Sequence, residues 1–232
     1  MGAAPAAPVV GIVHTSFLAV GTLAALFREI GPEVAVRHVV DGGLLASVIA
    51  QRGVSDELRA RLLERFRAAA DAGCDVVFSQ CSSVGEVADE AARTLEVPVV
   101  KIDAAMAERA CELGSRIGVI ATLETTLGPT GRLVVEAARA NGRSVDVVSV
   151  LVPDAFALLE RGERDAHDER VLAAVRELAQ RVDVVVCAQG SMAAILPRLG
   201  ETRVPVLTSP RLGVERAVAL ARRLASQRSA QA

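Results

Sequence analysis

Aromatic side chains are nearly absent from this chain of 232 residues, which contains five Phe, no Tyr and no Trp. Proteins that bind single-stranded nucleic acid stack the bases on aromatic rings, so a surface of that kind is excluded. The net charge is −2, with acidic and basic residues interspersed. Because nucleic-acid-binding domains are usually basic, the charge also argues against a nucleic-acid partner. With 51% hydrophobic residues, the core is expected to consist of Val, Leu, Ile and Ala.

Long apolar segments are missing as well. No run approaches the roughly 20 apolar residues of a membrane-spanning helix, so we expect no membrane partner. The first ten residues, MGAAPAAPVV, lack the basic and apolar regions of a signal peptide. We expect them to form a short disordered tail before the first strand, and we expect a cytoplasmic protein.

The sequence also lacks the common motifs for nucleotides and metal ions. It contains neither GxGxxG nor GxxxxGK[ST], the glycine-rich sequences that bind phosphate groups. The four cysteines, Cys74, Cys81, Cys111 and Cys187, follow no zinc-binding spacing. Cys187 lies among valines and is expected to be a buried packing residue. We therefore expect free thiols, no cofactor and no metal.

What the chain does contain is an internal repeat. Residues 75–109 read DVVFSQCSSVGEVADEAARTLEVPVVKIDAAMAER, and residues 183–216 read DVVVCAQGSMAAILPRLGETRVPVLTSPRLGVER. Both predict a strand, a polar turn, a helix, a Val-Pro strand, a second turn and a second helix. Solenoid repeats are roughly 20–50 residues long, which is too short for this period. The pattern fits a duplicated α/β half-domain, with Cys-Ser-Ser at 81–83 in one copy and Gln-Gly-Ser at 189–191 in the other.

Short apolar strands alternate with helical segments along both halves. The expected strands are Val9–His14, Val34–Val40, Val76–Ser79, Val99–Ile102, Ile117–Ala121, Val145–Leu151, Val184–Ala188 and Val206–Leu207. Such alternation predicts parallel sheets that are covered on both faces. We expect an α/β fold with two pseudo-symmetric flavodoxin-like lobes, each a roughly four-stranded parallel sheet flanked by helices, with a cleft between the lobes. The expected lobes are residues 1–113, completed by a C-terminal helix at 210–232, and residues 114–209.

Ligands of open parallel sheets bind beyond the carboxyl ends of the strands. Small hydroxyl side chains dominate at these ends, and they suit a small anion such as a carboxylate, held together with backbone N–H groups. The candidates for substrate binding are Thr15, Ser16, Asp41, Ser82, Ser83, Thr122, Gly190, Ser191 and Ser209. Ser and Thr at these places are equally suited to cap helices. His14 adds a group that titrates near neutrality, although a packing role is as consistent with its position.

The sequence DVVFSQCSS, with Gly-Val-Ile-Ala-Thr at 118–122 and a matching turn in the second half, resembles the aspartate/glutamate racemase superfamily. That group includes hydantoin racemases, maleate isomerase and arylmalonate decarboxylase, and the resemblance covers roughly residues 9–216. It implies that Cys81 is the first catalytic cysteine, that Ser82 and Ser83 bind substrate, and that Thr122 occupies the family's threonine position. It also implies a cofactor-independent enzyme, a small carboxylate substrate and a homo-oligomer.

The chain departs from that family at two places. Family racemases carry a second cysteine where the repeat places Gln189, and Cys187 aligns with Ser79 rather than with Cys81. The first strand ends in His14-Thr15-Ser16, where amino-acid racemases of the family often have Asp-Ser. Specificity for glutamate is therefore not implied.

These residues allow several reactions. Racemisation by two bases needs a proton acceptor on one face of the α-carbon and a donor on the other. Cys81 precedes a predicted helix, where backbone N–H groups and the helix dipole favour a thiolate. Gln189 cannot exchange a proton at neutral pH, but its amide can stabilise an enolate or oxyanion. A second base would be His14 or a carboxylate.

We predict a cofactor-independent racemase or isomerase with Cys81 as the catalytic thiol, aided by Gln189 and His14. The alternatives are a decarboxylase with Cys81 as proton donor, thiol addition in a cis–trans isomerase, and a non-catalytic small-molecule binding protein. His38 and His167 are expected to be ordinary surface or loop residues, and Asp168 is expected to begin a helix.

Overall fold

The computed structural model describes residues 7–231, and the side chains of residues 7–228. Most of the expected N-terminal tail therefore lies outside the described residues. The chain forms two compact units, one of which extends to Ile102 and resumes at Arg211, while the other comprises Asp103–Pro210. In the described part, no helix is long and apolar enough to cross a membrane.

The first unit contains one four-stranded parallel sheet. Its strands are β1 (Val9–His14), β2 (Ala35–Val40), β3 (Val76–Ser79) and β4 (Val99–Lys101), in the order β2-β1-β3-β4. Because all four strands run in parallel, their carboxyl ends lie along one edge. Strand β1 ends at His14, and β3 ends at Ser79, two residues before Cys81. These two strands are neighbours at the centre of that edge.

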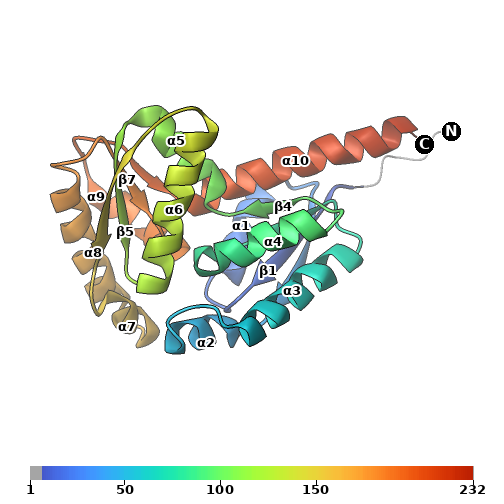
Figure 1. Ribbon diagram of the computed structural model, residues 1–232, viewed down its shortest axis with the longest axis horizontal. Helices are drawn as coiled ribbons and strands as arrows, with labels where there is room; N and C mark the ends of the chain where they lie inside the picture. Colours follow the sequence, from blue (N-terminus) through green and yellow to red (C-terminus); the bar gives the residue numbers. More distant parts are fainter. Residues whose placement is uncertain (1–6, 232) are drawn as a thin grey trace. The chain divides into compact units, whose positions relative to one another are not determined.

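Helices cover both faces of this sheet (Figure 1). The helices are α1 (Val20–Ile30), α2 (Leu44–Ala50), α3 (Asp56–Asp71), α4 (Gly85–Thr94) and α10 (Ser209–Gln231), with a short 3-10 turn η1 (Ser82–Val84). Side chains of α1 and α10 pack with Ile12 and Phe78 on one face. Side chains of α2, α3 and α4 pack with Val13 and Val77 on the other.

Helix α3 illustrates how local sequence fixes an element. The Ser55 side chain accepts a hydrogen bond from the Leu58 N–H at 3.4 Å, which caps the helix, and acidic residues occupy its first turn. Leu58, Leu62 and Phe66 then recur at helical spacing and are buried against the sheet. Gly11 in β1 permits the segment that follows α3 to approach the strand closely, because a Cβ on Gly11 would lie 2.8 Å from the Cys74 sulfur.

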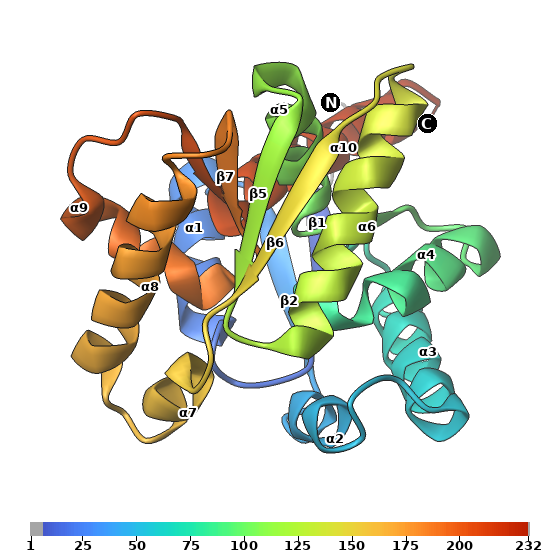
Figure 2. The same cartoon turned by 60° about the vertical axis from the view of Figure 1, so that its left-hand side comes forward.

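The second unit has the same topology. Its strands are β5 (Arg116–Ala121), β6 (Asp146–Leu151), β7 (Val184–Cys187) and β8 (Val206–Thr208), in the order β6-β5-β7-β8 and all parallel. The helices are α5 (Ala104–Leu113), α6 (Glu124–Ala140), α7 (Ala155–Glu160), α8 (Arg164–Leu178), the 3-10 turn η2 (Gly190–Ile195) and α9 (Leu196–Leu199). Figure 2 shows α6 on one side of this sheet and α8 on the other.

The prediction of two four-stranded parallel sheets flanked by helices is confirmed. The boundary between the units differs from the expected one, because residues 103–113 belong to the second unit: α5 packs against α6, β7 and β8. The sequence reading also missed α2 and α7. The expected helix start at Asp168 was wrong, since α8 begins at Arg164 and Asp168 lies inside it.

Candidate functional site

The carboxyl edge of the first unit's sheet brings together the candidates that follow β1, β2 and β3. The Gln80 N–H donates to the Val13 carbonyl at 3.2 Å, and the Asp41 N–H donates to the His14 carbonyl at 2.9 Å. These backbone bonds continue the ladder past the strand ends. They hold the segments beginning at His14, Asp41 and Gln80 side by side.

Cys81 occupies the turn between β3 and α4. Its backbone is extended, with φ −121° and ψ 116°, and the 3-10 turn η1 begins at the next residue. Cys81 is half-buried and packs against the apolar cluster beneath α3 and α4, whereas Ser82 and Ser83 are buried. The cysteine thus lies where the chain turns from strand to helix at the carboxyl edge, as the sequence predicts.

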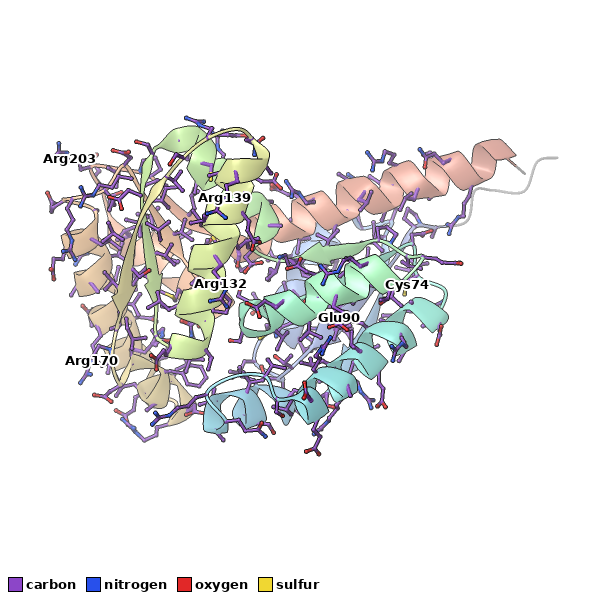
Figure 3. The ribbon with its side chains drawn as sticks, viewed as in Figure 1. Cys74, Glu90, Arg132, Arg139, Arg170 and Arg203 are labelled. Atoms are coloured by element: carbon purple, nitrogen blue, oxygen red, sulfur yellow. The ribbon has the colours of Figure 1, made fainter. Side chains whose placement is uncertain are left out.

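The other three cysteines are buried in the two cores. Cys74 (labelled in Figure 3) precedes β3 and is therefore at the opposite end of that strand from Cys81. Burial raises the pKa of the Cys74 and Cys111 thiols, and it raises the pKa of Cys187 to about 12. The prediction that Cys187 is a buried packing residue is confirmed, because its side chain lies in the core beneath α8.

His14 forms a hydrogen-bonded pair with His38. The His14 Nε2 atom lies 2.9 Å from the His38 Nδ1 atom, and the ring centroids are 5.1 Å apart. His14 is completely buried, and burial, with a smaller contribution from His38, lowers its pKa from 6.5 to about 4. His38 lies on β2 and is exposed, so it is a surface residue as expected, but its pairing with His14 could not be predicted from the sequence.

Thr15 and Asp41 both have partners within the first unit. The Gln80 amide approaches the Thr15 hydroxyl at 3.4 Å, and Thr15 is buried. The Asp41 carboxylate accepts two hydrogen bonds from Arg61 of α3, at 2.9 and 2.6 Å. Asp41 is therefore neutralised by α3, which makes it a poor anchor for a substrate carboxylate. Ser16 follows in the same loop and is half-buried.

In the second unit, Gln189 occupies the position that Cys81 has in the first. Its backbone is also extended, with φ −116° and ψ 137°, and it immediately precedes η2. The Thr122 N–H donates to Gln189 Oε1 at 2.5 Å, and Gln189 Nε2 donates to the Thr122 hydroxyl at 2.8 Å. Since a backbone N–H can only donate, this pair fixes the orientation of the amide.

A threonine and a glutamine thus pair at the carboxyl edge of each unit. Thr15 and Thr122 hold equivalent places after the first strand of each sheet, and Gln80 and Gln189 reach them from the third. In both pairs the hydroxyl oxygen accepts from the amide, so the hydroxyl proton is free to donate elsewhere. A sequence comparison of the halves does not find this pairing, because Gln80 lies one residue before Cys81 whereas Gln189 aligns with it.

The remaining candidates of the second unit follow β7 and β8. Gly190 and Ser191 begin η2 and are half-buried. Ser209 follows β8 and is buried, and its hydroxyl has no hydrogen-bond partner.

A buried polar group that sequence reasoning misjudged lies on α8. His167 is completely buried, and its Nδ1 atom lies 2.7 Å from the Asp168 carboxylate. Asp168 is buried too and faces Arg198 at 3.6 Å. The expectation of an ordinary surface or loop histidine was wrong, because α8 packs against η2 and covers this position.

No cluster suited to a metal ion exists within residues 7–231: nowhere do three or more His, Cys, Asp or Glu side chains converge. Besides the Asp41 carboxylate, which Arg61 neutralises, the polar groups described at the two carboxyl edges are hydroxyls, amides, a thiol and imidazoles. Such groups can bind a small anion and move protons.

A family model described as Asp/Glu/Hydantoin racemase matches residues 9–217. Among solved structures, a glutamate racemase isoform of Bacillus anthracis is similar with a TM-score of 0.75 and 16% identity, over 94% of this chain and 83% of that one. An allantoin racemase of Klebsiella pneumoniae is similar with a TM-score of 0.62 and 21% identity, over 95% of this chain and 88% of that one. An aspartate racemase of Picrophilus torridus is similar with a TM-score of 0.66 and 12% identity, over 94% of each chain. At these identities the likeness shows the shared fold. No curated protein sequence matches the chain significantly.

Proposed function

The chain belongs to the Asp/Glu/hydantoin racemase family, and we propose that it is a cofactor-independent racemase or isomerase of a small carboxylate-containing compound, with Cys81 as its catalytic thiol. One observation carries the proposal. Of the four cysteines, Cys81 is the one that is not buried, and it lies in the strand-to-helix turn at the carboxyl edge, where ligands of parallel sheets bind.

In this proposal the Cys81 thiolate removes the α-proton of the substrate and the thiol returns it. The negative charge that develops on the substrate carboxylate is stabilised by hydroxyl and amide donors. Thr15 and Thr122 are suited to this role because their hydroxyl protons are not used by the glutamines that hold them. Ser82 and Ser83, which follow the thiol in the same turn, are assigned the same role in this proposal. The amide of Gln189, already bound to Thr122, has a second N–H to offer.

A racemase with two bases requires a second group to exchange a proton on the other face of the substrate. Gln189 cannot do so, because an amide does not titrate near neutrality. His14 is the candidate on the same carboxyl edge as Cys81, and burial lowers its pKa, so its imidazole is neutral at pH 7.

Gln189 in place of a second cysteine also favours a second candidate function. A decarboxylase needs one proton donor, which protonates the enolate left after carbon dioxide departs. Cys81 alone can supply that proton, and Gln189 can stabilise the enolate. The decarboxylase therefore accounts for the single accessible thiol without a second base.

The experiment that tests these proposals follows proton exchange in deuterium oxide. Wild type and Cys81→Ser are incubated with aspartate, glutamate, allantoin and a panel of small amino and dicarboxylic acids, and the α-proton is followed by NMR. Exchange with full recovery of the compound supports the racemase, and loss of carbon dioxide supports the decarboxylase. Binding without either reaction would leave a small-molecule binding protein and contradict both enzymes.

A further inference from the structure

The two histidines of the first unit are arranged asymmetrically. His38 is paired in the sheet with Ile12, two residues before His14, so both imidazoles stand on the same face of the sheet. The contact between them joins Nε2 of His14 to Nδ1 of His38 at 2.9 Å. At that distance one nitrogen must donate and the other accept.

The remaining ring nitrogens face different surroundings. The Nδ1 atom of His14 is closed off from solvent and has no hydrogen-bond partner. A buried polar atom without a partner costs about 1–3 kcal/mol, so an unused acceptor at this place calls for an explanation. His38, in contrast, is exposed on β2, the edge strand of the sheet. The pair therefore connects an enclosed nitrogen at the carboxyl edge with the protein surface.

We infer that His14 and His38 form a proton relay, in which Nδ1 of His14 exchanges a proton with the substrate and His38 exchanges it with solvent. This inference rests on the proposed function and names the second base that the proposal requires. When a proton reaches Nδ1 of His14, the proton on Nε2 passes to Nδ1 of His38, and the proton on Nε2 of His38 leaves to water. Each ring loses one proton as it gains one. The reverse transfers reset both rings: Nδ1 of His14 gives its proton to a substrate carbanion, Nδ1 of His38 gives its proton to Nε2 of His14, and water gives one to Nε2 of His38.

The burial of His14 explains why a partner is needed. A buried imidazolium is disfavoured, and the pKa of His14 is lowered accordingly. A lone buried histidine would therefore be a weak proton acceptor. A relay avoids the buried cation, because His14 is relieved of one proton as it receives another. Within residues 7–228 no carboxylate is hydrogen-bonded to either imidazole, so the charge is removed through His38.

The first test reads the tautomers directly and needs no substrate. The chain contains three histidines, so protein labelled with ¹⁵N-histidine gives three sets of ring signals. We expect His14 to carry its proton on Nε2, with Nδ1 of both His14 and His38 unprotonated. In His38→Ala the His14 signals should shift, whereas those of His167 in the second unit should not.

The second test measures α-proton exchange in deuterium oxide from each enantiomer of the substrate found for wild type. His38→Ala should slow exchange from one enantiomer by about 10-fold or more, and added imidazole should restore part of the rate. His14→Gln should slow the same enantiomer by roughly 100-fold, without rescue. Arg37→Gln, at the neighbouring position of β2 and on its opposite face, should match wild type.

Several outcomes would overturn the relay. These are a proton on Nδ1 of His14 in the free protein, unchanged His14 signals in His38→Ala, and equal exchange from both enantiomers in His38→Ala and wild type. A merely structural role for His38 would slow both enantiomers together and would show no response to imidazole. If wild type exchanged no α-proton of any compound, the proposed function itself would fail, and the relay with it.

Discussion

Residues of the same type differ in this chain by how deeply they are buried, and burial changes the pKa of their side chains. Four cysteines share one side-chain chemistry, yet three are buried in the cores and one is half-buried at a carboxyl edge. A thiol reacts as the thiolate, so burial, which raises the pKa, suppresses reactivity. The same reasoning separates His14, buried with a lowered pKa, from an ordinary surface histidine.

Thiol labelling follows from this difference. In the native protein, iodoacetamide at neutral pH should label Cys81 first, and Cys74, Cys111 and Cys187 should react at least about 10-fold more slowly, because burial raises their pKa values. Peptide mapping by mass spectrometry measures the four rates. In urea the four rates should converge. Faster labelling of Cys187 than of Cys81 in the native protein would contradict the assignment.

His14 should make stability depend on pH. Its folded pKa is about 4 and its ordinary value is 6.5, so between these values the unfolded chain binds the proton and the folded protein does not. Stability is therefore complete above pH 6.5 and falls as the pH drops towards 4, by at most about 3 kcal/mol. Urea unfolding of wild type and His14→Gln across this range measures the difference. Equal losses in the two proteins would show that His14 is not the group responsible.

At the scale of elements, the turns that follow β3 and β7 are equivalent in backbone but not in side chain. Cys81 and Gln189 have nearly the same extended backbone, and each precedes a 3-10 turn. The amide of Gln189 satisfies both the N–H and the hydroxyl of Thr122. Gln189 is therefore a positioning residue for Thr122, whatever it does to a ligand.

Removal of this amide should weaken the second unit. Gln189→Ala leaves the N–H of the buried Thr122 without its acceptor, so the free energy of unfolding should fall by about 1–3 kcal/mol. Gln180→Ala, an exposed glutamine in the same unit, should cost less than about 0.5 kcal/mol. Urea denaturation measures both. Equal effects of the two substitutions would contradict a structural role for the amide.

Two helical glycines in the first unit offer a matched test of packing. A Cβ on Gly213 of α10 would overlap the Ile102 carbonyl, whereas a Cβ on Gly21 of α1 would meet nothing within 4 Å. Gly213→Ala should therefore destabilise the protein by about 1–3 kcal/mol. Gly21→Ala should be neutral or stabilise it by up to about 1 kcal/mol. Thermal unfolding measures both, and a neutral Gly213→Ala would show that α10 can move away from β4.

Elements with strong periodicity or continuous apolar runs could be predicted from the sequence, and short ones could not. Strand β1 matched its expected bounds, because its apolar run is nearly continuous. Helices α2 and α7 are seven and six residues long, too short for a periodic signal. The expected start of α8 was wrong. Asp168 is a residue type that often begins a helix, but here it is buried inside α8 and bound to His167.

The location of the candidate residues was predictable where the position in the chain decides it. Strand ends and the repeat were enough to place Cys81, Thr15, Thr122 and Gln189 at the carboxyl edges of the sheets. Pairings between side chains of different strands were not, because they depend on the register of the sheet. The His14–His38 contact and the Gln80–Thr15 contact both belong to this class. So does the neutralisation of Asp41 by Arg61, which weakens one predicted ligand-binding residue.

At the scale of the whole molecule, the chain is a duplication whose halves have kept one topology and diverged at their strand ends. Both units have four parallel strands in the same order. The first carries a thiol and an imidazole pair at its carboxyl edge, whereas the second carries an amide at the place equivalent to the thiol. The fold is thus symmetric where it packs and asymmetric where the chemistry is proposed, and the groups proposed to transfer protons lie in the first unit.

The central claim is that Cys81 transfers a proton of the substrate. The most direct measurement is the rate at which deuterium from solvent enters the α-carbon of a substrate, in wild type, Cys81→Ser and Cys111→Ser. We predict that Cys81→Ser lowers the rate by at least about 100-fold, whereas Cys111→Ser, a change in a buried thiol, keeps a rate close to that of wild type in the folded protein. Undiminished exchange in folded Cys81→Ser would contradict the account.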